Sequence, residues 1–100
     1  MLKPAQDLVK EVEASIKSST NKDIGAYGKL SMLSAEVGEL ADEVIALEGD
    51  RVEDKSYQTK DDLAKEVVDV IFNALTIANH YGIDMDEYFE NRIAKIKSKF

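Results

Sequence analysis

The sequence has no cysteine and a single histidine, and these scarcities exclude several kinds of site. Without cysteine the chain can form neither a disulfide framework nor a thiolate metal site. One histidine is too few for a typical zinc centre, and it does not support an argument for a nucleophile with a base partner. A chain without cysteine fits a cytoplasmic location, which we expect here.

Long apolar runs and excess positive charge are also missing. No segment approaches the roughly 20 apolar residues that cross a bilayer, and residues 1–15 resemble neither a signal peptide nor a membrane anchor. The chain has 13 Lys and Arg against 20 Asp and Glu, for a net charge of −7. A chain this acidic repels the phosphates of DNA and RNA, so we expect neither a nucleic-acid nor a membrane partner.

Alternation of apolar and polar residues, which is typical of half-buried strands, is absent over any useful length. Apolar residues instead recur at steps of three and four, so we predict an all-α protein with residues 1–100 as one domain. Proline, aspartate and glycine supply the start and stop signals. The first predicted helix runs from Pro4 to about Ser18, and the second begins between Asp23 and Lys29 and ends at Gly49 and Asp50. The third begins with the cap pattern of Thr59 and Asp62 and ends near His80, before Gly82. The fourth begins with the cap pattern of Asp84 and Glu87 and ends near Lys99.

The third predicted helix is apolar around most of its circumference. Val67, Val70 and Ala74 lie on one side, and Val68 and Phe72 extend the apolar surface around the helix. Three other short helices can hardly cover so broad a surface. We therefore expect a four-helix subunit that assembles into a homodimer or homotetramer, forming a homo-oligomeric helical bundle. The alternative is a central helix wrapped within a monomer.

Two acidic stripes border these apolar faces. The segment "AEVGELADEV", residues 35–44, carries four acids in ten residues with no Lys or Arg among them. Since each helical residue turns by about 100°, acids three and four apart share one narrow stripe beside the apolar face. If the second and third helices pack through these faces, two acidic edges converge near the core. The stripes are Glu36, Glu39 and Glu43 on the second helix, and Asp62, Glu66, Asp69 and Asn73 on the third.

Converging carboxylates at the edge of a core repel each other and lose solvent, so they need either protons or a cation. Their hard oxygens suit Mg²⁺, Mn²⁺ or Ca²⁺. Each stripe taken alone also matches an ordinary solvated helix face, so spacing leaves both interpretations open. Other sites fit poorly: His80 has Ile77 rather than Glu three residues before it, and no Gly-rich phosphate loop is present.

The segment "KLSMLSAEVGELADEV" and the later "EVVDVIFNAL" resemble the MazG-like nucleoside triphosphate pyrophosphohydrolases. These belong to an all-α group with the dCTP and dimeric dUTP pyrophosphatases as relatives. The family's mark is a Glu-x-x-Glu on one helix and a Glu-x-x-Asp on the next, here Glu36 and Glu39, then Glu66 and Asp69. The likeness covers roughly residues 27–100. Many members have a Glu just before the first pair, where this chain has Ala35, so the resemblance leaves one metal ligand in doubt.

The resemblance implies that these four carboxylates are catalytic and hold Mg²⁺, with Mn²⁺ also suitable. It further implies that a nucleoside or deoxynucleoside triphosphate is split into the monophosphate and pyrophosphate, as in house-cleaning of the nucleotide pool. The alternative, which Ala35 keeps open, is a non-catalytic acidic oligomer that works as an interaction or regulatory module. The preferred base is not visible in the sequence.

Several other residues are candidates for substrate contacts. Lys95 and Lys99 lie one helical turn apart and could reach a distal phosphate, or they could be solvated surface lysines. Lys99 stands where relatives commonly have Arg, and Asn91 is near the place of an Asn in their last helix. Lys29 could touch phosphate or merely balance the acids. Three aromatic residues could stack on a base or belong to the core or an interface: Tyr27, Phe72 and Tyr81.

Overall fold

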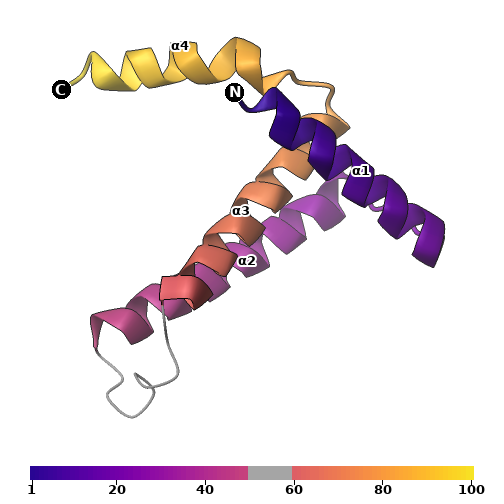
Figure 1. The fold of residues 1–100 in the computed structure, drawn as a ribbon, viewed down its shortest axis with the longest axis horizontal. Helices are drawn as coiled ribbons and strands as arrows, with labels where there is room; N and C mark the ends of the chain where they lie inside the picture. Colours follow the sequence, from indigo (N-terminus) through magenta and orange to yellow (C-terminus); the bar gives the residue numbers. More distant parts are fainter. Residues whose placement is uncertain (50–59) are drawn as a thin grey trace. The chain divides into compact units, whose positions relative to one another are not determined.

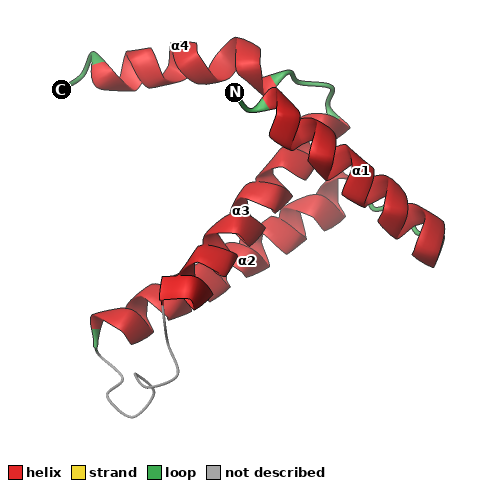
Figure 2. Cartoon of the chain, in the orientation of Figure 1, coloured by secondary structure: helices red, strands yellow, loops and turns green. Residues whose placement is uncertain are grey.

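The structure, a computed structural model, describes residues 1–49 and 60–100. The described residues form four helices and no strand, which confirms the all-α prediction (Figures 1 and 2). The predicted start of the third helix at Thr59 lies outside the described residues. The helices are α1 (Lys3–Thr20), α2 (Ala26–Glu48), α3 (Lys60–His80) and α4 (Met85–Lys97).

The end of α1 differs from the prediction, because the helix continues beyond Ser18 to Thr20. The hydroxyl of Ser19 donates to the Ser15 carbonyl at 2.8 Å, and that of Thr20 donates to the Ile16 carbonyl at 2.7 Å. Both hydroxyls are thus satisfied inside the helix, so they do not compete for the backbone N–H groups and the helix does not end at Ser18. The chain leaves the helix at Asn21, whose φ of 55° is left-handed.

The other helix ends follow the expected signals closely. α2 begins at Ala26, inside the predicted interval, and Gly49 with a φ of 101° ends it. Gly82, with a φ of 67°, follows α3 in the same left-handed region, which glycine enters without steric cost. The Asp84 side chain caps α4 by accepting a hydrogen bond from the Asp86 N–H at 3.0 Å. α4 ends at Lys97, slightly before the predicted Lys99.

The chain divides into two compact units, one of residues 1–24 with 75–100 and the other of residues 25–74. α3 contributes its first part to the second unit and its last residues to the first. Each unit is described by itself below, and the single domain over residues 1–100 stays a prediction.

A buried amide holds the first unit together. Gln6 of α1 is only 1% exposed. Its Nε2 donates to Asn79 Oδ1 at 3.1 Å and to the Ile83 carbonyl at 2.8 Å, and its Oε1 accepts from the Met85 N–H at 2.8 Å. The side-chain oxygen and nitrogen of Gln6 are thus both hydrogen-bonded, as burial requires. This network fixes α1 against the turn that leads into α4.

The second unit is a hairpin in which α2 and the first part of α3 run side by side in opposite directions (Figure 1). Ala46 is buried, and Leu33, Leu40 and Val70 are half-buried. This contact positions the acidic residues, because it fixes which faces of the two helices meet.

One apolar face of this hairpin stays exposed. Val37 is 48% exposed and Val67 is 40% exposed. Residues two apart on a helix point about 160° apart, so Val37 lies away from Glu39 and Val67 lies away from Asp69. The exposed apolar face therefore points away from Glu39 and Asp69, the two exposed acids. Its members on α2 are Leu30, Val37 and Val44, and on α3 they are Val67, Ile71 and Ala74.

Candidate functional site

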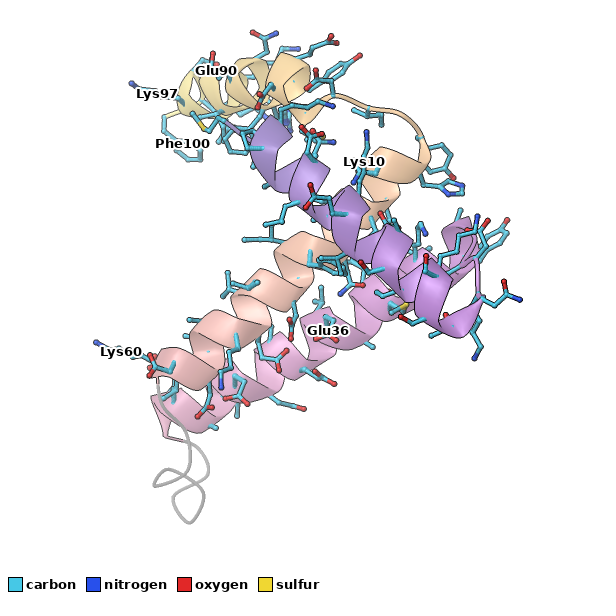
Figure 3. The ribbon with its side chains drawn as sticks, turned by 45° about the vertical axis from the view of Figure 1, so that its right-hand side comes forward. Lys10, Glu36, Lys60, Glu90, Lys97 and Phe100 are labelled. Carbon is cyan, nitrogen blue, oxygen red and sulfur yellow. The ribbon has the colours of Figure 1, made fainter. Side chains whose placement is uncertain are left out.

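Carboxylates from both helices of the hairpin come together. Glu36 and Glu39 of α2 and Glu66 of α3 each offer one carboxylate oxygen, and these three atoms lie within 4.8 Å of one another. Figure 3 shows Glu36 on the side of α2 that faces α3. The expected convergence of two acidic edges is therefore present, and the name carboxylate cluster is used below for Glu36, Glu39, Glu66 and the neighbouring Asp69.

The burial of the cluster is uneven. Glu39 and Asp69 are exposed, whereas Glu36 and Glu66 are half-buried. The Oε2 atoms of Glu36 and Glu66 are buried and have no hydrogen-bond partner among the described residues. A buried oxygen without a donor costs free energy, and a charged one costs more. The cluster is therefore unfavourable unless a proton or a cation compensates it.

The pKa values of the two half-buried acids express this cost. Burial, helped by repulsion from Glu39 and Asp69, raises the pKa of Glu36. Burial also raises the pKa of Glu66 to about 7, with further contributions from a proton shared with Glu36 and from repulsion by the other three carboxylates. Two carboxyl groups can share a hydrogen bond only when one of them is protonated. This agrees with the lack of any other donor for the buried Oε2 atoms among the described residues. Near neutral pH the cluster is thus partly protonated when no cation is bound.

The residues present fit a divalent cation by their chemistry. All donors are carboxylate oxygens, which are the ligands that Mg²⁺ and Mn²⁺ prefer. Two of these oxygens are buried without a partner, so they are not simply solvated side chains. Asp69 adds negative charge from the flank, since it raises the pKa of both Glu36 and Glu66. The described residues include no other cluster of three potential metal ligands.

Two further members of the predicted stripes lie near the cluster. Asn73, only 6% exposed, donates from Nδ2 to the Asp69 carbonyl at 2.8 Å, one turn back along α3. Glu43 is half-buried and lies outside the three grouped ligands. Asn73 therefore belongs to the packing of the hairpin, which the sequence pattern alone does not distinguish from a site.

The predicted phosphate contacts are divided between the two units. Lys29 lies on α2 in the same unit as the carboxylate cluster and is half-buried. Asn91, Lys95 and Lys99 belong to the other unit, where Asn91 Nδ2 donates to the Glu87 carbonyl at 3.3 Å. The contact of these three residues with a phosphate stays a prediction.

The aromatic candidates divide by exposure. Tyr27 is 89% exposed and Tyr81 is 64% exposed, so neither belongs to the core of the described chain. The ring of Tyr81 contacts that of His80 edge to face at 5.0 Å. Phe72 is half-buried. Stacking on a base or burial at an interface stays a prediction for both tyrosines.

A hollow beside α3 has no counterpart in the sequence pattern. It is shallow and open to solvent, with a volume of about 470 Å³, and its lining consists of five exposed residues of this one helix: Asp61, Ala64, Lys65, Val68 and Asp69. Sequence reasoning singled out only Asp69 as a site residue, because the other four look like an ordinary outer helix face. The shape of the surface at such a helix face depends on the neighbouring elements, which residue spacing does not predict.

The comparisons agree with this geometry. A family model described as the MazG nucleotide pyrophosphohydrolase domain matches residues 28–99. No match came from the curated proteins or from the solved structures. In the described part of the chain no helix is both long and apolar enough to cross a membrane. The family match covers α4, most of α2 and all of α3, including the whole carboxylate cluster. The chain belongs to the MazG nucleotide pyrophosphohydrolase domain family.

Proposed function

We propose that the protein hydrolyses nucleoside or deoxynucleoside triphosphates to the monophosphate and pyrophosphate, in a cytoplasmic role that cleans the nucleotide pool. The reaction depends on Mg²⁺, with Mn²⁺ as a substitute. One observation carries the proposal: Glu36, Glu39 and Glu66 bring carboxylate oxygens within 4.8 Å of one another, and Glu36 and Glu66 each bury an unpartnered oxygen. Neither DNA nor RNA nor a membrane is a partner, because the net charge of −7 repels anionic surfaces.

Each carboxylate has a role that follows from its position. Glu36 and Glu66, which interact with each other, would hold the cation together with Glu39. Asp69, exposed like Glu39 and outside the three grouped ligands, would complete the ligand set from the exposed side. A bound divalent cation supplies charge neutralisation for the phosphates and lowers the pKa of water. Glu39 and Asp69 are accessible to solvent, so either can accept a hydrogen bond from the attacking water and orient it.

Cationic side chains complete the substrate site in this proposal. An acidic protein binds a polyanion only where cations intervene. Lys29, on the hairpin, balances the cluster or contacts a phosphate, and Lys95, Lys99 and Asn91 contact the distal phosphates. Ala35 removes one carboxylate that many relatives carry, so the four remaining acids have to suffice.

The proposal is tested by measuring pyrophosphate release from a panel of NTPs and dNTPs, with Mg²⁺, with Mn²⁺ and with a chelator. We expect pyrophosphate and the matching monophosphate in equal amounts, and only when the metal is present. Release of orthophosphate alone would indicate a phosphatase instead. No turnover of any nucleotide would favour the rival interpretation, a non-catalytic acidic oligomer that acts as a regulatory module.

We further propose that a second copy of this chain covers the exposed apolar face of the hairpin, giving a homodimer or a homotetramer. Apolar side chains such as Val37 and Val67 gain little from remaining in water, and burying them is favourable at about 25 cal/mol per Å². The face points away from Glu39 and Asp69, so assembly through it leaves these two exposed carboxylates accessible.

Light scattering coupled to size-exclusion chromatography at micromolar concentration measures this assembly. We expect an oligomer for the unchanged protein and a shift toward monomer for Val67→Glu, because a buried charge opposes association. Ser31→Glu adds the same charge to an exposed position of α2 outside the apolar face and should leave the mass unchanged. A stable, well-folded monomer of the unchanged protein would contradict the assembly.

A further inference from the structure

The starts of α1 and α4 are joined by hydrogen bonds that run in both directions. The Gln6 Oε1 atom of α1 accepts from the Met85 N–H at 2.8 Å, where α4 begins. The Asp86 carboxylate of α4 accepts from the N–H groups of Leu2 and Lys3, the latter at 3.1 Å, where α1 begins. The first N–H groups of a helix have no partner within it, so each helix start receives a cap from a side chain of the other helix. Figure 1 shows the two helices starting close together and then running apart.

Asn79 extends this network to the end of α3. The Gln6 Nε2 atom donates to Asn79 Oδ1 at 3.1 Å, and Asn79 Nδ2 donates to the Gln6 carbonyl at 3.1 Å. The same Nε2 atom donates to the Ile83 carbonyl, in the turn before α4, at 2.8 Å. Hydrogen bonds are directional, so a buried and satisfied network holds its partners in one geometry. The name polar clamp is used below for Gln6, Asn79 and Asp86, which all belong to the first unit.

Little else in the described chain holds α4 in place. Every residue from 90 to 100 is exposed, and within α4 only Met85 and Phe89 are half-buried. The direction of α4 is therefore set at its start. Lys95 lies about 15 Å from Met85 along the helix, so a rotation of about 10° at the start displaces Lys95 by about 2.6 Å. A displacement of this size is enough to break a hydrogen bond.

The polar clamp also joins a segment outside the family match to one inside it. The match covers residues 28–99, which include all of α4 and no residue of α1. The hydrogen bonds of Gln6 thus give α4 a support that the matched residues do not supply.

We propose that the polar clamp fixes the direction of α4, and that Gln6, Asn79 and Asp86 are thereby positioning residues for the distal phosphates of the substrate. They act through Lys95 and Lys99, which contact these phosphates in the proposed function, on which this inference rests. The clamp residues themselves do not touch the substrate. The clamp therefore affects substrate affinity and leaves the chemical step at the carboxylate cluster unchanged.

Two variants open the clamp, and each has a matched control. Gln6→Met keeps the length of the side chain and removes its hydrogen bonds, whereas Asp86→Ala removes an acceptor at an exposed position, so that folding should be preserved. Val9→Ala is the control for Gln6→Met, because it takes atoms from a buried side chain of α1 without removing a hydrogen bond. Glu87→Ala is the control for Asp86→Ala, because it removes an equal charge from the same turn of α4. Asp86→Asn keeps an acceptor oxygen and tests for rescue.

Hydrogen exchange of the full chain, followed by mass spectrometry over Met85–Lys97, measures whether α4 is held. We expect exchange in α4 to be about tenfold faster in Gln6→Met and Asp86→Ala, the scale of one lost hydrogen bond. Asp86→Asn should restore most of the protection, and both controls should exchange as the unchanged protein does. Exchange in α4 that is the same in Gln6→Met, in Asp86→Ala and in the unchanged protein would overturn the clamp.

Kinetics with the nucleotide that the unchanged protein turns over fastest measures the positioning. We expect Gln6→Met and Asp86→Ala to raise KM several-fold with kcat unchanged. Inhibition by inorganic tripolyphosphate, which has no nucleoside, should weaken by the same factor. In a protein that already carries Lys95→Gln and Lys99→Gln, Gln6→Met should not raise KM further, because residues that act through one another are not additive. An equal rise of KM in that background would contradict the proposal, since the clamp would then not act through the two lysines.

The failure of the positioning role and the failure of the proposed function give different results. If the unchanged protein releases no pyrophosphate from any nucleotide, the proposed function fails and the positioning of phosphates fails with it. If it releases pyrophosphate, and both clamp variants keep the unchanged KM although α4 exchanges faster, the positioning role alone is wrong.

Discussion

Replacing Glu39 by glutamine should abolish pyrophosphate release without unfolding the protein. The substitution keeps the shape of the side chain and removes one carboxylate from the cluster. Since the cation and the attacking water both depend on that charge, we expect kcat to fall at least about 100-fold, the scale of losing one group that stabilises charge in an active site. Asp69→Asn should have a similar effect from the other helix.

The same variants should be as stable as the unchanged protein, or more stable, when no metal is present. Glu39 is one of the charges that raise the pKa of Glu36 and Glu66, so its removal relieves repulsion. Asp42→Asn is the control, because it removes an equal charge from an exposed position of α2 outside the grouped ligands. It should retain activity.

Activity and thermal unfolding measured on the same preparations decide between the two interpretations of the acids. Solvated acids would give near-zero stability change and unaltered turnover for all these variants. A Glu39→Gln protein that turns over nucleotide at the unchanged rate would show that the site lies elsewhere.

The second large effect is on stability, which should depend on pH and on Mg²⁺ together. The pKa of Glu66 is raised to about 7, mainly by burial. Between its ordinary pKa of 4.5 and about 7 the folded protein holds a proton that the unfolded chain has lost. The free energy of unfolding of the metal-free protein should therefore fall as the pH rises through this window. The contribution is fully present below 4.5 and is lost above 7.

Asp86 changes the free energy of unfolding with pH in the opposite direction, and it does so over a lower pH range. Its pKa is lowered, first by a hydrogen bond from the N-terminal ammonium and then by those from the N–H groups of Leu2 and Lys3. Its stabilising contribution is present above its ordinary pKa of 3.8 and is lost only at lower pH. The fall between 4.5 and 7 can thus be assigned to Glu66 and Glu36.

Mg²⁺ should reverse the loss at high pH, because it compensates the same charges that a proton compensates at low pH. At a concentration tenfold above Kd, mass action adds about 1.4 kcal/mol. For a domain of this size that raises Tm by about 5 to 10 °C. The increase should be larger at pH 8 than at pH 5, because protons compete for the carboxylates at the lower pH.

Scanning calorimetry with a chelator, with MgCl₂ and with NaCl of equal ionic strength measures this effect. Glu66→Gln should flatten the pH dependence between 4.5 and 7 and remove most of the response to Mg²⁺. If MgCl₂ and NaCl raise Tm equally at pH 8, the cluster does not bind the cation.

The sequence by itself determined the helices and the residues of the cluster. The steps of three and four are local, so they define each helix and the face that Glu36 and Glu39, or Glu66 and Asp69, share. The paired motif also identified the family, because its spacing lies within two helices. The prediction from local sequence was wrong at helix ends. The first helix, for example, ends at Thr20, whose hydroxyl donates to a carbonyl of its own helix, and not near Ser18.

Only the tertiary structure decided how the acids differ from one another. Residue spacing places Glu36 and Glu39 on the same stripe and predicts the same environment for both. In the structure Glu36 is half-buried with an unpartnered oxygen, whereas Glu39 is exposed. The pKa of Glu66 and the hollow beside Lys65 also have no signature in the sequence. Burial and pKa depend on the distance to groups on another helix, and periodicity fixes the face of a residue without fixing what packs against it.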